Sequence, residues 1–189
     1  MVIEVCYTVM VERTLIDMSR RITIDECNEL YKVHHTPAHV IGHCRAVCRV
    51  ALGIGKKLNE NGYHLDLDLI QGAALVHDVA RVEPDHALVG AKILEEKGFY
   101  DEADIVRVHM RYHFGKFEDL NETDLVCLGD RLVKEDKYVG LDERIEYIIH
   151  KAGDKPEVTK RILENKATTR IFMDKIENRI GQTIDSLFL

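Results

Sequence analysis

Gly72-Ala-Ala-Leu-Val-His77-Asp78-Val-Ala-Arg81 is the stretch around which the rest of the chain is organised. Small and apolar residues run through it, so the pattern predicts a helix that is buried on most sides, with His77 and Asp78 adjacent in its middle. An ionised carboxylate removed from water costs several kcal/mol unless it is paired or binds a metal. Two partners for Asp78 fit the sequence: Arg81, four residues after His77 on the same helical face, or a metal ion.

The composition is that of one globular domain with a sizeable core. The chain has 189 residues, of which 46% are hydrophobic and 31% charged, as is ordinary for such a domain. The net charge of −7 argues against a nucleic-acid or anionic-membrane surface, since either would need clustered Lys and Arg. We therefore expect neither nucleic acid nor membrane as a partner.

Cysteine usage and the lack of an apolar run indicate a cytoplasmic protein. No run reaches membrane-spanning length, and the N-terminus lacks a signal-peptide layout. The five cysteines are scattered without C-x-x-C spacing, which favours reduced thiols; they are Cys6, Cys27, Cys44, Cys48 and Cys127. We expect Cys44 and Cys48 to pack in the core.

Start and stop signals predict an all-α, single-domain bundle of about seven helices. Thr36-Pro37 reads as an N-cap followed by proline at the first helical position. The expected helices that matter most cover residues 36–61, 66–83, 85–98, 101–115 and 121–136, and a long one begins at Pro156. Its apolar stripe is expected to be Ile162, Leu163, Ile171, Ile176 and Ile180. The β-branched run Val2–Val11 fits either a short strand or a loosely attached helix.

Ligand-type side chains fall on five different expected helices. They are His43, His77 with Asp78, His86, His109 and Asp130. Imidazole and carboxylate together suit a borderline divalent ion such as Fe, Mn, Co, Ni or Zn. Each residue also has an ordinary explanation: His43 as a core histidine, His86 as a surface residue, and Asp130 paired with Arg131 or Lys134.

As an ordered set, His43, His77-Asp78 and Asp130 resemble the HD superfamily of metal-dependent phosphohydrolases. Ala74-Leu-Val-His-Asp-Val-Ala-Arg81 is similar to the family's Ala-Leu-Leu-His-Asp-Ile-Gly-Lys, and Leu128-Gly-Asp-Arg-Leu132 to its Ala-Asp-Lys-Leu element. His86-Ala-Leu-Val-Gly-Ala91 resembles the turn of HDIG-like members with extra histidines. More loosely, the chain resembles HD domains associated with molybdenum-cofactor nucleotidyltransferases. The Gly-Tyr-Pro of cyclic-dinucleotide phosphodiesterases is absent after His113, which argues against that activity.

The resemblance implies a domain layout and a ligand set. Residues 36–136 would form the metal-binding core, 1–35 an N-terminal extension packed on it, and 137–189 C-terminal helices of the same domain. One ion would be held through His43, His77, Asp78 and Asp130. Residues matching His86 and His109 are what two-metal members add, with Asp78 as the bridge. We therefore expect two divalent ions, Fe or Mn first and Ni, Co, Zn or Mg as alternatives.

A second set of side chains lies one helical turn from an expected ligand and could contact phosphate. The pairs are His39 with His43, Arg81 with His77, His113 with His109, and Lys134 with Asp130. Arg81 and Lys134 are the favoured catalytic and phosphate-binding cations. The ordinary alternative is a solvated surface neighbour. His113 also competes with His109 for the ligand role, because both would share one helical face.

The resemblance implies a metal-dependent phosphohydrolase that acts on a small phosphorylated molecule, with a nucleotide favoured. A metal-activated hydroxide would attack phosphorus. Whether the bond is a phosphomonoester, phosphodiester or phosphoanhydride is open, and so is a homodimer. The alternative is a non-catalytic, metal-containing module that binds a ligand and regulates.

Overall fold

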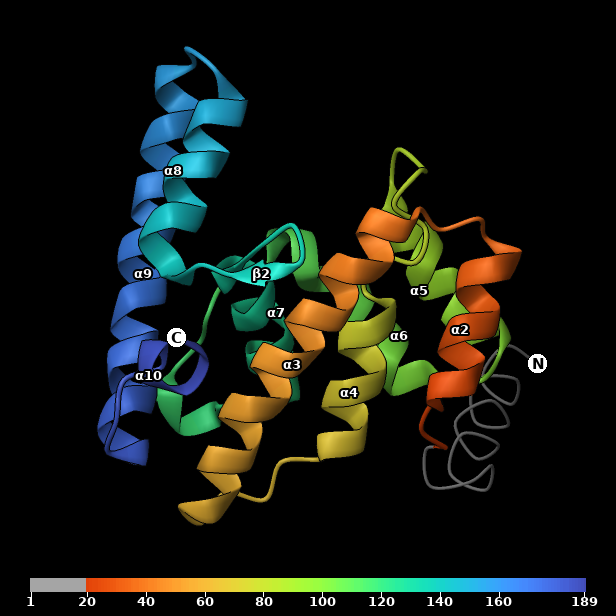
Figure 1. Cartoon of the computed structure of the whole chain (residues 1–189), viewed down its shortest axis with the longest axis horizontal. Coiled ribbons are helices and arrows are strands. Elements are labelled where there is room, and N and C mark those ends of the chain that lie inside the picture. The colour runs from red at the N-terminus through yellow and green to blue at the C-terminus, as the bar shows by residue number, and fades with distance from the viewer. Residues whose placement is uncertain (1–19) are drawn as a thin grey trace, which may run out of the picture.

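The computed structural model describes residues 20–189, so the strand or helix expected at Val2–Val11 lies outside the described residues. Within this range the chain is all-α, as predicted, with nine α-helices and one two-stranded sheet (Figure 1). The helices are α2 (Ile24–Val33), α3 (Ala38–Glu60), α4 (Leu67–Val76), α5 (His86–Glu96), α6 (Tyr100–Val108), α7 (Glu122–Leu132), α8 (Gly140–Ala152), α9 (Pro156–Ile180) and α10 (Asp185–Phe188). Short 3-10 turns, η1 (His109–Arg111) and η2 (Phe117–Asp119), follow α6.

The centre of the molecule is α3, which packs against α4 and α7 (Figure 1). Its core-facing positions recur at helical spacing, and Cys44, Val47, Ala51 and Ile54 are fully buried. Gly129 of α7 permits a close approach, since a Cβ there would lie 3.0 Å from the Val47 carbonyl oxygen. The two helices are therefore held together tightly beside the positions of His43 and Asp130.

The helix pair α5 and α6, together with α2, covers another side of α4. Helices α5 and α6 pack against each other, and α6 and α2 both contact α4. Helix α2 begins with a capping box in which Thr23 and Glu26 satisfy each other's backbone N–H groups. Cys27, Leu30 and Tyr31 of α2 are buried in the same hydrophobic cluster as α3 and α4.

Helix α4 is shorter than predicted and ends at Val76, before His77 and Asp78. Residues 77–84 instead form tight turns with i to i+3 hydrogen bonds, such as the Val79 N–H to the Val76 carbonyl. Side chains from other segments donate hydrogen bonds to backbone carbonyls at the end of α4 and in the turns that follow. The Tyr31 hydroxyl donates to the Leu75 carbonyl, and the Thr36 hydroxyl donates to the Val79 carbonyl at 2.7 Å.

That use of Thr36 also corrects its expected role. The N-cap of α3 is Pro37, whose side chain has no hydrogen-bonding group, and the Thr36 hydroxyl donates to the Val79 carbonyl instead of capping α3. Two other helix ends were predicted too late. Helix α6 ends at Val108 instead of near Gly115. Helix α7 ends at Leu132 instead of Asp136, because β1 (Val133–Lys134) pairs antiparallel with β2 (Lys137–Tyr138).

The C-terminal helices α8 and α9 pack together, and their joined ends rise beyond the rest of the molecule (Figure 1). The buried hydrophobic residues of α9 are Phe172, Met173 and Ile176 in its second half, while Ile162 and Ile180 are partly buried against the core. The predicted stripe is therefore wrong at Leu163 and Ile171, which are 48% and 59% exposed. None of the helices within residues 20–189 has the length and apolar character needed to cross a bilayer.

Candidate metal centre

The ligand-type side chains gather into two neighbouring groups, each with ligand atoms within 4.8 Å of one another. The first group is His43, His77 and Asp130; the second is Asp78, His86 and His109. All six were named from the sequence as candidate ligands, and they come from α3, the turn after α4, α5, η1 and α7. The fold thus brings together residues that are far apart in the chain.

The two groups are joined by one peptide bond, that between His77 and Asp78. Each residue serves a different group, yet Asp78 Oδ2 lies only 3.8 Å from His77 Nε2. The other carboxylate oxygen, Oδ1, faces the second group. His77 has right-handed helical backbone angles (φ −56°, ψ −32°), and consecutive residues in that conformation point about 100° apart, so the two side chains can serve different groups.

Backbone carbonyls orient three of the four imidazoles. His43 Nδ1 lies 2.8 Å from the Glu135 carbonyl, His77 Nδ1 2.8 Å from that of Ala74, and His109 Nδ1 2.7 Å from that of Val106. A carbonyl only accepts, so each Nδ1 must donate, and each Nε2 of a neutral ring is left with a lone pair. This arrangement is typical of histidines that bind metals through Nε2.

The first group fits a cation. His43 Nε2 lies 3.0 Å from Asp130 Oδ1, which places a lone pair against a carboxylate unless a proton or a metal lies between them. His77 Nε2 is buried and has no hydrogen-bond partner. A buried nitrogen acceptor without a donor is costly, and a divalent ion would satisfy all three atoms.

The second group shows the same feature on a carboxylate. Asp78 Oδ1 is 3.1 Å from His86 Nε2 and 3.4 Å from His109 Nε2. Although these distances are short, Oδ1 is buried and accepts no well-aligned hydrogen bond. Atoms that converge on a common point without hydrogen-bond alignment are what a shared metal ion requires.

Electrostatics keep the carboxylates ionised. Burial would raise the pKa of Asp78, but the neighbouring His77, His109, His86 and Arg81 together hold that pKa far below its usual range. Burial would also raise the pKa of Asp130, but the neighbouring His43 and His77 lower it, and the net shift is downward. Burial lowers the pKa of His77. Ionised carboxylates and a neutral imidazole are the forms that bind metal.

Arg81 is next to this centre, but not by the helical spacing that was predicted. The helix has already ended, and the side chain is folded back within the turn. Its Nε lies 3.6 Å from Asp78 Oδ2, and one terminal nitrogen lies 3.0 Å from His86 Nε2. The side chain is 45% exposed. Arg81 therefore lies beside Asp78 Oδ2, and Asp78 Oδ1 is left without a hydrogen bond.

The other three expected phosphate contacts do not join either group. Lys134 lies in β1 instead of on the helix of Asp130, and its ammonium is 3.0 Å from Glu143. His39 is exposed on the first turn of α3. His113 is exposed beyond η1, so it does not share a helical face with His109, which is buried.

Arg144 is the residue near the site that sequence reasoning missed. It lies on α8, and a terminal nitrogen is 3.8 Å from Asp130 Oδ1. The side chain is 17% exposed. No spacing rule connects it to a ligand, because it follows a strand pair and sits on a different helix from Asp130. Arg131, an expected partner of Asp130, instead donates to the Tyr112 carbonyl and to Thr169.

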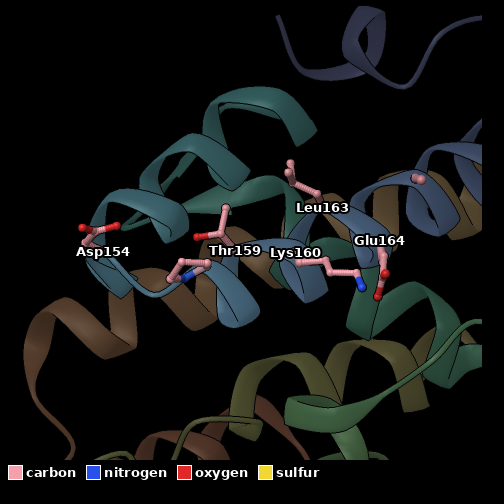
Figure 2. A pocket seen from close by; sticks show the side chains of 7 residues that line it. Asp154, Thr159, Lys160, Leu163 and Glu164 are labelled. Atoms are coloured by element: carbon pink, nitrogen blue, oxygen red, sulfur yellow. The ribbon is translucent and has the colours of Figure 1, made fainter.

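A separate hollow of about 690 Å³ lies on the exposed half of α9. Figure 2 shows its labelled lining residues Asp154, Thr159, Lys160, Leu163 and Glu164. None of the six candidate ligands lines it. This hollow is therefore not part of the metal centre.

Comparison with known proteins bears on the same region of the chain. The family model described as HD domain matches residues 40–139, a range that contains all six candidate ligands. The chain is 28% identical over 142 residues to the uncharacterized protein MJ0778 of Methanocaldococcus jannaschii, which covers 66% of this chain and 84% of that protein. No solved structure gives a significant match.

A second relative is a tRNA (cytidine(56)-2'-O)-methyltransferase of Thermoplasma volcanium. It is 30% identical over 148 residues, which cover 74% of this chain but 39% of that protein. The chain therefore spans about two fifths of the length of this relative. The methyltransferase activity in its name is a statement about that longer protein.

Proposed function

The chain belongs to the HD domain family, and from that premise we propose that it is a metal-dependent phosphohydrolase acting on a small phosphorylated molecule, with a nucleotide as the favoured substrate. The observation that carries the proposal is the pair of three-residue groups joined at His77-Asp78. His77 Nε2 and Asp78 Oδ1 are buried without hydrogen-bond partners, so a metal-binding role explains atoms that are otherwise costly to bury.

In this proposal His43, His77 and Asp130 would hold one ion, and His86 and His109 would hold a second together with Asp78. Fe or Mn is favoured for this nitrogen and oxygen set, with Ni, Co, Zn or Mg as alternatives. Two bound ions would lower the pKa of water and neutralise the charge that develops on phosphate. Asp78 would contribute to both sites, since its Oδ2 lies 3.8 Å from His77 Nε2 and its Oδ1 lies 3.1 Å from His86 Nε2.

The chain's own groups orient the ligands and bind the substrate. The backbone carbonyls of Glu135, Ala74 and Val106 keep three rings with Nε2 directed inward. Arg81 is the proposed phosphate contact, because its half-exposed guanidinium lies beside both Asp78 and His86. Lys134 is less suited to that role, since its ammonium pairs with Glu143.

The test uses the full chain loaded with Mn or Fe and a panel of nucleotides and phosphomonoesters. We expect turnover of at least one compound, and we expect Asp78→Asn to abolish it. Asp68→Asn is the matched control, because Asp68 is an exposed aspartate on the first turn of α4. Normal hydrolysis by Asp78→Asn would place the activity elsewhere. Nucleotide binding without turnover would instead identify the alternative, a metal-containing regulatory module.

A further inference from the structure

Arg144 combines burial with unused hydrogen-bonding capacity. Its Nε is fully buried and has no hydrogen-bond partner. The ion pair of its terminal nitrogen with Asp130 Oδ1 spans 3.8 Å, which is too long for a hydrogen bond. A guanidinium carries five N–H donors in a planar fork. The Arg144 guanidinium, which lies next to the first group, therefore has N–H donors that no acceptor in the described part of the protein satisfies.

A nearby arginine shows what a purely structural guanidinium looks like in this fold. Arg131 is also largely enclosed, but it donates to the Tyr112 carbonyl and to Thr169 Oγ1, and it lies 4.5 Å over the ring of Phe114. Its donors are used by the protein itself. Arg144 differs, because the ring of Tyr147, 5.7 Å away, supplies a face and no acceptor for the fork.

A role for Arg144 as the counter-ion of Asp130 accounts for only part of this geometry. Asp130 Oδ1 already lies 3.0 Å from His43 Nε2 and belongs to the first metal group. A counter-ion would be expected to approach a buried carboxylate to hydrogen-bonding distance. The guanidinium instead stays beyond that distance, at the edge of the first group.

We propose that Arg144 binds the phosphate oxygens of the substrate beside the first group, His43, His77 and Asp130. The ligand class is a phosphate group, whose oxygens match the planar fork of an arginine and accept two parallel hydrogen bonds. Arg81 lies beside the second group, so the two arginines flank the centre from α8 and from the turn after α4. This inference rests on the proposed function for its physiological substrate, but not for phosphate binding itself.

The experiment measures the binding of inorganic phosphate to the full chain loaded with Mn, by titration calorimetry, together with the Mn content by elemental analysis. Arg144→Gln should keep the Mn content of the wild type and weaken phosphate binding by about ten- to a hundredfold, as expected for lost charge-assisted hydrogen bonds. Arg144→Lys should weaken it less, since the charge remains but the fork is lost. Arg107→Gln is the matched control and should change neither quantity, because Arg107 pairs with Glu95 at 2.6 Å and belongs to neither metal group.

The outcomes separate this inference from the proposed function. Arg144-dependent phosphate binding without hydrolysis of any compound supports the inference and counts against the phosphohydrolase. Hydrolysis by the wild type with unchanged phosphate affinity in Arg144→Gln and Arg144→Lys overturns the inference alone. Loss of Mn from either variant also overturns it, because Arg144 would then act as a structural partner of Asp130. If Arg144→Gln does not fold, Arg144→Lys gives the same comparison.

Discussion

His109 and His113 carry the same side chain but lie in opposite environments. His109 is buried, donates from Nδ1 to the Val106 carbonyl and directs Nε2 toward Asp78. His113 is exposed. We predict that His109→Ala lowers the bound metal by one ion per chain, whereas His113→Ala keeps the wild-type content. Elemental analysis after loading with excess Mn measures both.

The reverse result, metal loss in His113→Ala with an unchanged His109→Ala, would mean that the segment after α6 rearranges when it binds an ion. Equal metal content in both variants would remove His109 from the ligand set. In either case the assignment of His109 as a ligand in the second group would be wrong.

Arg81 should affect substrate more than metal. Its guanidinium is 45% exposed and lies beside Asp78 and His86 without hydrogen-bonding Asp78. We predict that Arg81→Gln raises the KM for phosphate substrates by about ten- to a hundredfold while the Mn content stays constant, since one charged contact is worth about 1.5–3 kcal/mol. Steady-state kinetics with parallel metal analysis tests this. Loss of metal would instead show that Arg81 has a structural role and holds Asp78 in the position that binds metal.

At the scale of single residues, the sequence predicted the candidate ligands wherever residue type and order along the chain were enough to identify them. His43, His77, Asp78 and Asp130 could be named because buried imidazoles and carboxylates need partners. Their proximity is now a structural fact, while their metal binding stays a prediction. Arg144 could not be found, because a lone arginine on another helix carries no local signal. Lys134 was misplaced, because a strand interrupts the expected helical spacing.

At the scale of elements, the site depends on how closely α3 and α7 approach. A Cβ on Gly129 would lie 3.0 Å from the Val47 carbonyl oxygen and 3.4 Å from the Ala51 Cβ. We predict that Gly129→Val lowers the free energy of unfolding by about 1–3 kcal/mol through overpacking. It should also weaken metal binding at the first group, since His43 lies on α3 and Asp130 on α7. Chemical denaturation and Mn titration measure the two effects.

Gly115 provides the matched control for that substitution. A Cβ at Gly115 meets no atom within 4 Å, so Gly115→Val should leave both stability and Mn affinity close to those of the wild type. If Gly129→Val is as stable as Gly115→Val, α3 and α7 can separate at little cost, and the close approach does not position the metal ligands.

Helix ends were the elements that sequence predicted least well, and the reasons are contacts across the fold. The pattern continued through His77 and Asp78, but the Tyr31 and Thr36 hydroxyls bind the Leu75 and Val79 carbonyls and stabilise turns there. These acceptors are more than forty residues away from their donors, so no local window contains the signal. Starts were easier to predict, because Asp66 and Asn121 cap their own helices.

At the scale of the whole molecule, the candidate ligands tie most of the core together. They come from α3, the turn before α5, the start of α5, η1 and α7. Metal binding should therefore be coupled to folding. We predict that Mn at a hundred times its Kd raises the Tm by about 5–10 °C over the chelated protein, since this linkage is worth about 2.7 kcal/mol. Differential scanning calorimetry measures the shift.

The comparison needs a variant that cannot bind at the first group. His43→Ala should retain only part of the shift, because the second group remains. A wild-type Tm that is the same with Mn and with chelator would contradict metal binding to the folded state at either group. If Mn raises the Tm of His43→Ala as much as that of the wild type, the first group does not bind Mn, and the second group accounts for the whole shift.

The overall class was predictable, whereas the placement of the C-terminal arm was not. Helical periodicity and few prolines predicted the all-α fold correctly. The same periodicity in α9 marked Leu163 and Ile171 as core, but both are exposed: Leu163 lies in the first half of α9, which has no fully buried hydrophobic residue, and Ile171 is exposed although its neighbours Phe172 and Met173 are buried. Periodicity identifies the apolar face of a helix and does not show where along its length a neighbour ends.

The buried thiol of Cys44, next to His43, can report local opening of the structure around the candidate metal ligands. Cys44 has no exposed surface, and burial first, with the charge of Asp78, raises the pKa of its thiol. Alkylating reagents attack the thiolate of an accessible cysteine, so Cys44 should react only when α3 and the 77–84 turn separate. We expect Mn to slow its labelling by iodoacetamide, followed peptide by peptide with mass spectrometry. Cys27, which is also buried, would show whether that slowing is confined to α3 or extends to α2.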